Sequence, residues 1–449
     1  MMHEKDKITV AWICHFSNEK IRSLYPREVS RPIYKFARHI LNLPQKTGVV
    51  SDFAPWVNIG IDEMSKRPNV ELHVIAPIID LKVSKYEFES DGVHYHFFRS
   101  DWTQLIRHII RNPKLWLCLQ NNSHIINCFL DEISPDVINL IGTENAYYSC
   151  SVLNNNHKAP IFVSLQTVYS NPARLKYMPD IDKSINWYID KRILSECMYF
   201  GVEDKMYNDL IKHYNPSAIT LNFSFCVPPY PSIIGNISKE YDFVNFAMQH
   251  SEKKSTPDSI IAMSEVVKKY PRAKLNIVGG CEQAVKHKLE KLITAYHLED
   301  NIVFTPYFTK HTDLLEHIQK ARMAVLPIKL DVIPGTVLQA MHYKLPVITY
   351  STTGTPYINK RKNRVLLCKE NNPSELALQM VWAIEHPTEI ETMSNDAKDW
   401  INRFIDNNKR TQRLIDAYHA IISHYQSGTP IENSLLFDED KVVYDEDNF

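Results

Sequence analysis

Short apolar runs alternate with longer amphipathic stretches along most of this chain, and this alternation constrains the fold more than any other feature. Runs such as ITVAWIC and LPVITY have the length and composition of buried strands. The stretches between them, such as 258–270 and 283–297, repeat apolar residues at helical spacing. Strands that alternate with helices build parallel sheets, so the sequence predicts an α/β fold. We expect strands at 8–14, 71–77, 93–98, 136–142, 160–166, 197–202, 218–223, 243–248, 274–280, 301–307, 323–328 and 345–350.

One segment interrupts this series. Residues 226–242, CVPPYPSIIGNISKEYD, contain three prolines and a glycine, which is typical of a linker. The sequence therefore predicts two doubly wound, Rossmann-like domains at 1–230 and 231–404, which face each other across a cleft and bind ligands at the carboxyl ends of their strands. We expect a helix at 405–428 that packs back toward the first domain. The acidic tail at 429–449 has seven acidic residues and one lysine, a composition that favours disorder.

Composition restricts the class of partner and the compartment. The formal charge of −1 gives no field that would attract nucleic acid. Eight cysteines without a CxxC pair argue against a zinc ribbon and indicate reduced core residues. No apolar run approaches the roughly 18 residues of a membrane span, so we expect a cytoplasmic protein. The basic stretches 20–46 and 102–119 suit peripheral contact with an anionic membrane at its inner face, although solvated helix faces explain them more simply.

Glycine is scarce, and its placement limits the kind of phosphate site. The eleven glycines form neither GxGxxG nor a P-loop, so an ordinary dinucleotide fingerprint is excluded. In PGTVLQAMHY, Gly335 follows a proline at the start of a short helix, where exposed N–H groups make an anion site. Thr336 and Gln339 share a helix face with Gly335. The STTGTP loop adds Gly354 and Thr355 as further backbone donors, and Lys254 and Lys329 lie at strand ends where they could neutralise a diphosphate.

The order of strand, loop, acidic residue, PGT helix, PVIT strand and GTP loop resembles the C-terminal domain of GT-B glycosyltransferases, in particular the retaining enzymes of family 4 (group 1). The resemblance spans about 243–400. It implies transfer of a sugar from a nucleotide-diphospho-sugar of UDP or GDP type to a glycan or lipid-linked acceptor, in surface polysaccharide synthesis. The nucleotide sugar is then a substrate, and neither a cofactor nor a metal ion is implied.

The resemblance also assigns roles to individual residues. Asp331 corresponds to the acidic residue that contacts the donor sugar, and Gln339 stands where the family has a ribose-binding Glu. Gln249 and Lys254 occupy the positions of a donor-binding Arg and Lys. Further donor contacts fall near Tyr307 and at Gly48, Gly354 and Thr355. In the first domain, Gln166 replaces the family's catalytic-side His, and Glu144 follows the neighbouring strand.

The positions at which this sequence departs from the family pattern leave alternative functions open. Neutral amides at 166, 249 and 339 favour a catalytically silent GT-B-like binding or scaffold subunit of a polysaccharide assembly complex. An epimerase or an inverting transferase is a third alternative, for which Glu144 is the available base. Each glycine is also compatible with an ordinary turn, and Asp331 with a helix cap. The histidines of HYH at 94–96 share one strand face, but without an evident further ligand we predict no metal site.

Overall fold

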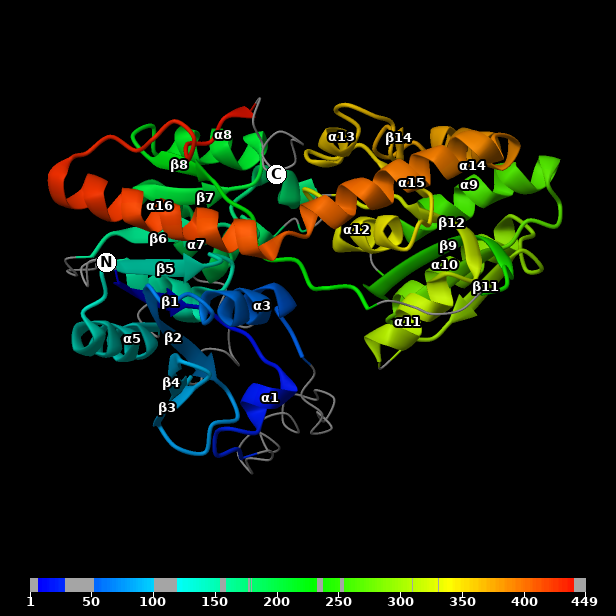
Figure 1. Ribbon diagram of the computed structural model, residues 1–449. Coiled ribbons are helices and arrows are strands. Elements are labelled where there is room, and N and C mark those ends of the chain that lie inside the picture. Colours follow the sequence, from blue (N-terminus) through cyan, green and yellow to red (C-terminus); the bar gives the residue numbers. More distant parts are fainter. Residues whose placement is uncertain are drawn as a thin grey trace. The chain divides into compact units, whose positions relative to one another are not determined.

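The computed structural model describes residues 7–28, 52–100, 119–153, 159–176, 178, 180–231, 237–250, 254–308, 310–329 and 331–439 (Figure 1). The chain divides into two units. The first contains the residues up to Pro228 together with the segment that starts at Asn407, and the second is Pro229–Asp406. The division after Pro228 falls within the proline-rich segment at 226–242. The basic stretches are described only at 20–28 and 119, and Gly48 lies outside the described residues.

The first unit is built on a sheet with the strand order β3-β4-β2-β1-β5-β6-β7-β8, in which only β3 is antiparallel to its neighbour. Its strands are β1 (Ile8–Ile13), β2 (Val70–Ile78), β3 (Lys85–Ser90), β4 (Val93–Arg99), β5 (Val137–Ile141), β6 (Ile161–Ser164), β7 (Tyr199–Val202) and β8 (Ile219–Asn222). The helices are α1 (Glu19–Arg22), α3 (Pro55–Met64), α5 (Gln120–Ile133), α6 (Ala146–Ser149), α7 (Ile185–Glu196), α8 (Lys205–Tyr214) and α16 (Asn407–Ser427). The sequence missed β3, because KYEFES alternates polar and aromatic residues and forms no continuous apolar run.

The second unit is built on an all-parallel sheet with the strand order β11-β10-β9-β12-β13-β14. Its strands are β9 (Tyr241–Gln249), β10 (Leu275–Gly280), β11 (Ile302–Thr305), β12 (Ala321–Leu326), β13 (Val347–Tyr350) and β14 (Leu366–Cys368). The helices are α9 (Thr256–Lys269), α10 (Gln283–Ala295), α11 (His311–Ile318), α12 (Gly335–His342), α13 (Thr355–Ile358), α14 (Pro373–Glu385) and α15 (Pro387–Phe404). The strand order reverses between β9 and β12, which is where doubly wound sheets place ligands.

The long helix α16 belongs to the first unit although it follows the second in sequence. The buried Tyr418 on α16 accepts hydrogen bonds from Trp12 Nε1 at 3.0 Å and from Asn139 Nδ2 at 2.6 Å. These donors lie on β1 and β5, so α16 is bonded to the centre of the first sheet. Among the described helices, none is both long and apolar enough to cross a membrane.

The start of the acidic tail is ordered, which corrects the expectation of disorder for 429–439. The N–H of Asn222 donates to the carbonyl of Leu435 at 3.0 Å, and that of Phe437 donates to Thr220 at 2.8 Å. This segment therefore pairs with the edge strand β8. The acidic composition of this segment favoured a prediction of disorder, but Ile431 is buried and packs into the core of the first unit.

Candidate functional site

The start of α12 has polar groups without partners among the described residues. Pro334 caps the helix, and Gly335 is exposed with free space around its Cα. Within the described residues, the N–H groups of Gly335 and Thr336 donate to no acceptor of the chain, and the buried Oγ1 of Thr336 has no partner. A buried hydroxyl without a partner is costly, and a helix start binds anions through its free N–H groups. The PGT segment thus starts a helix with three donor groups that have no acceptor among the described residues.

Gln339 lies one turn further along α12, beside a residue that the sequence did not single out. Its Nε2 is 3.4 Å from Nε2 of His311, the first residue of α11. Burial lowers the pKa of His311, which favours a neutral imidazole. Gln339 offers amide donors and His311 offers an imidazole acceptor, and both lie at the carboxyl end of the second sheet. No sequence motif marks His311, because it follows a different strand.

Lys254 and Asp331 meet at the point where the strand order reverses. Their Nζ and Oδ2 atoms are 3.2 Å apart, and their side chains are 28% and 47% exposed. Lys254 follows β9 and Asp331 follows β12, so two neighbouring strands bring the pair together. A partly exposed ion pair is weak, and an incoming anion can therefore attract the lysine.

Lys329 forms an ion pair with Asp258. Its Nζ is 3.1 Å from Asp258 Oδ2, and both side chains are largely buried. The hydroxyl of Tyr350 donates to the same carboxylate at 2.7 Å. The geometry therefore does not support Lys329 as a counter-charge for a diphosphate: its charge is already balanced inside the unit.

The STTGTP loop is also engaged within the chain. The N–H of Gly354 donates to the carbonyl of Val332 at 3.1 Å. The buried Thr355 donates its hydroxyl to the carbonyl of Tyr350 at 3.0 Å. The geometry therefore does not support this N–H and this hydroxyl as free donors for a diphosphate. The loop instead holds the segment that leads into α12.

Replacing Gly354 with alanine is expected to destabilise the second unit by about 1–3 kcal/mol. An added Cβ would lie 2.5 Å from both the carbonyl oxygen and Cγ1 of Val332, and the backbone oxygen cannot move cheaply. Chemical denaturation measures the change. Gly335→Ala is the matched control, because a Cβ there meets nothing within 4 Å, and its stability should be unchanged. Equal losses for both variants would contradict this distinction.

Gln249 and Tyr307 lie at the same end of the sheet, and neither forms a hydrogen bond to the α12 start in the part of the chain that the structure describes. Gln249 is the exposed last residue of β9, and Tyr307 lies beyond β11 with 51% of its surface exposed. An exposed aromatic ring at a strand end is suited to stacking on a planar group.

The first unit contains a separate group of candidate residues. Glu144 and Gln166 follow β5 and β6, which pair side by side with Ile141 opposite Ser164. The Oε2 of Glu144 is buried without a partner in the described residues, and burial raises the pKa of this carboxyl to about 7. The buried Asp190 on α7, which the sequence did not single out, lies close enough to raise this pKa further. A carboxyl with such a pKa is suited to proton transfer near neutral pH.

Replacing Glu144 with glutamine is expected to stabilise the protein at pH 8 by up to about 3 kcal/mol. The folded-state pKa, near 7, exceeds the ordinary glutamate value of 4.5, so between these pH values the folded protein holds a proton that the unfolded chain has lost. Wild-type stability should therefore fall as pH rises from about 4.5 to 7, and this slope should be smaller in the variant. Denaturation at several pH values tests this. The exposed Glu19→Gln is the control, and an unchanged slope in Glu144→Gln would contradict the prediction.

Residues 233–400 match the family model described as Glycosyl transferases group 1. The second unit is a group 1 glycosyltransferase domain. Over 158 residues the chain is 25% identical to an uncharacterized glycosyltransferase of Haemophilus influenzae. That match covers 35% of this chain and 42% of the relative, so the chain spans less than half of the relative's length.

Solved structures extend the likeness beyond the group 1 domain. Sucrose-phosphate synthase of Thermosynechococcus elongatus has a TM-score of 0.63 at 12% identity, over 93% of this chain and 100% of that one. Anabaena HepE, solved in complex with UDP, has a TM-score of 0.59 at 12% identity, over 92% and 100%. At such identities the likeness concerns the fold, and it confirms the predicted GT-B class, in which a group 1 domain follows a second Rossmann-like unit.

Proposed function

We propose that this chain transfers a sugar from a nucleotide-diphospho-sugar of UDP type to a glycan or lipid-linked acceptor with retention of configuration, in surface polysaccharide synthesis. The observation that carries the proposal is the open start of α12 inside a group 1 domain. There, the N–H groups of Gly335 and Thr336 have no acceptor, and the buried hydroxyl of Thr336 has no partner, among the described residues. UDP is the first nucleotide to test, because a protein of similar fold was solved with it.

The residues of the second unit suggest a division of roles. The N–H groups of Gly335 and Thr336 hold the diphosphate, and Lys254 offsets the negative charge that grows on it as the bond to the sugar breaks. Asp331 positions both Lys254 and the sugar. Gln339, with His311 beside it, binds the ribose diol, although an amide does so less strongly than a carboxylate. Peripheral contact with an anionic membrane would bring a lipid-linked acceptor to the enzyme.

A thermal-shift panel with UDP, GDP, CMP and their sugar conjugates tests the donor site. A ligand at one hundred times its dissociation constant stabilises the protein by about 2.7 kcal/mol. We expect UDP or its conjugates to raise the Tm, and Thr336→Val and Gln339→Ala to reduce the shift. Thr294→Val, an exposed position on α10, is the matched control. If no nucleotide stabilises the folded protein, the catalytically silent scaffold becomes the better account.

The buried carboxyl of Glu144 favours a second candidate, an inverting transferase with Glu144 as base. The two reactions differ in the anomeric configuration of the product, which NMR of the transferred sugar determines. For a retaining enzyme, we expect the donor configuration in the product and residual transfer in Glu144→Gln. An inverted product together with loss of transfer in that variant would overturn the stereochemical part of the proposal.

A further inference from the structure

One face of the first sheet gathers imidazole and carboxylate groups from three adjacent strands. β2, β3 and β4 each contribute alternate residues: Glu71 and His73, Glu87 and Glu89, and His94 and His96. The register places His73 directly opposite His94, and Glu89 opposite His94 on the other side. The sequence analysis found no further ligand for the histidines at 94 and 96. The missed partners are in ELHV, where Glu71 and His73 alternate on the neighbouring strand.

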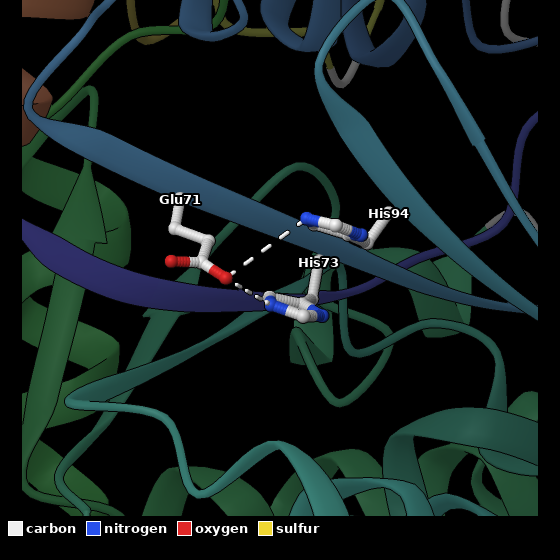
Figure 2. A group of neighbouring side chains, drawn as sticks. All are labelled: Glu71, His73 and His94. Atoms are coloured by element: carbon white, nitrogen blue, oxygen red, sulfur yellow. Dashed lines mark ion pairs between the residues drawn. The ribbon is translucent and has the colours of Figure 1, made fainter.

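Three of these side chains converge on one point, as Figure 2 shows. Oε1 of Glu71 is 3.5 Å from Nε2 of His73 and 3.9 Å from Nε2 of His94. The three candidate ligand atoms all lie within 4.8 Å of one another. A tetrahedral Zn²⁺ with bonds of about 2.0–2.1 Å holds its ligand atoms only about 3.4 Å apart. Small rotamer changes therefore suffice to close the site around an ion.

A hydrogen-bond chain prepares His73 as a ligand. Nδ1 of His96 is 2.7 Å from a carboxylate oxygen of Glu87, which only accepts, so this nitrogen donates. Nε2 of His96 is then an acceptor, and Nδ1 of His73 donates to it at 2.9 Å. The remaining nitrogen of His73, Nε2, consequently turns a lone pair toward Glu71. Carboxylate–histidine chains of this kind orient metal ligands and raise their basicity.

The point of convergence places acceptors against one another. In the tautomer that this hydrogen-bond chain sets, the Nε2 lone pair of His73 faces Oε1 of Glu71 at 3.5 Å. Lys7 pairs with the other oxygen, Oε2, at 3.0 Å and leaves Oε1 directed at the histidines. A cation between these acceptors would remove the repulsion.

We propose that Glu71, His73 and His94 bind a divalent transition-metal ion, with Zn²⁺ as the first candidate. Two imidazoles and one carboxylate are a ligand set that Zn²⁺ accepts with a fourth, open position. The side chains of Glu71 and His94 are 36% and 37% exposed, so an ion reaches the site and water completes its coordination. His96 and Glu87 act as positioning residues. The bound ion links β2 to β4 near the antiparallel edge strand of the first unit.

Calorimetric titration of the chelator-treated full chain with ZnCl₂ tests the proposal. We expect one ion per chain with a micromolar or lower Kd, weakened at least tenfold by Glu71→Gln, His73→Ala or His94→Ala. His96→Gln should weaken binding by about 10- to 100-fold through the lost hydrogen-bond chain. His287→Ala, an exposed histidine on α10, is the matched control and should bind as the wild type does.

Two further measurements keep the test decisive if a variant folds poorly. His94→Cys replaces one zinc ligand with another at an exposed position and should retain binding that His94→Ala loses. Titration with Co²⁺ should give a visible absorption band in wild type and control but not in His94→Ala. The absence of stoichiometric binding by the folded wild type, or binding that none of the ligand substitutions changes, would overturn the proposal. These readouts do not depend on sugar transfer.

Discussion

Replacing Lys254 with methionine is expected to lower the rate of sugar transfer by about 10²- to 10³-fold while leaving the protein folded. In the proposed reaction this ammonium group faces a diphosphate that gains negative charge as it leaves. Methionine keeps much of the side-chain volume but removes the charge. The Lys254–Asp331 pair is partly exposed, so its loss should cost little stability. Initial rates with a UDP-sugar and chemical denaturation measure the two effects separately.

The matched control is Lys288→Met, which removes an exposed lysine on α10. It should leave both the rate and the stability unchanged. The expected loss for Lys254→Met should appear in kcat more than in KM, because the charge develops in the transition state. A Lys254→Met protein that transfers sugar at the wild-type rate would remove this residue from the proposed mechanism.

Replacing Lys329 with methionine is expected to destabilise the second unit by about 3–5 kcal/mol, because the substitution strands a buried carboxylate. Asp258 loses the ammonium group at 3.1 Å, and the hydroxyl of Tyr350 is the side-chain donor that it keeps among the described residues. That hydroxyl donates to the carboxylate. Burial is the main cause that raises the pKa of Tyr350, and the nearby carboxylate of Asp258 raises it further. Chemical denaturation of the second-unit transition measures the loss.

Lys268→Met is the control for this second prediction. Lys268 pairs with Glu265 at 2.6 Å, but both side chains are about half exposed or more. Solvent screens such a pair, so the variant should lose less than about 1 kcal/mol. If both lysine substitutions cost the same, the buried pair at Lys329 has no special structural role. Restored stability in Lys329→Met combined with Asp258→Asn would support the stranded-charge explanation.

The strand and helix series was predictable from local sequence because each element carries its own pattern. All twelve expected strands are present, with boundaries shifted by at most two residues. The helix start at Gly335 was also predictable, since proline and glycine have local conformational preferences that need no distant partner. The exceptions, β3 and β14, are an alternating edge strand and a three-residue strand, which lack a long apolar run.

Local sequence could not predict which groups at the strand ends remain accessible to a ligand. Gly335 and Gly354 both follow strands, yet one lies in open space and the other is pressed against Val332. Lys254 and Lys329 both lie in loops at strand ends, yet the first is partly exposed and the second is buried against Asp258. In each case the decisive neighbour comes from a different segment of the chain.

The sequence by itself determined the α/β class, the order of the elements and the position of the α12 start, because these depend on patterns within a few turns or strands. Only the tertiary structure decided that Lys329 and the Gly354 loop serve the fold, that the carboxyl of Glu144 is buried, and that Glu71 and His73 lie beside His94. Charge balance, burial and ligand convergence depend on distances between strands that are remote in sequence. Those distances exist only after the sheets have formed.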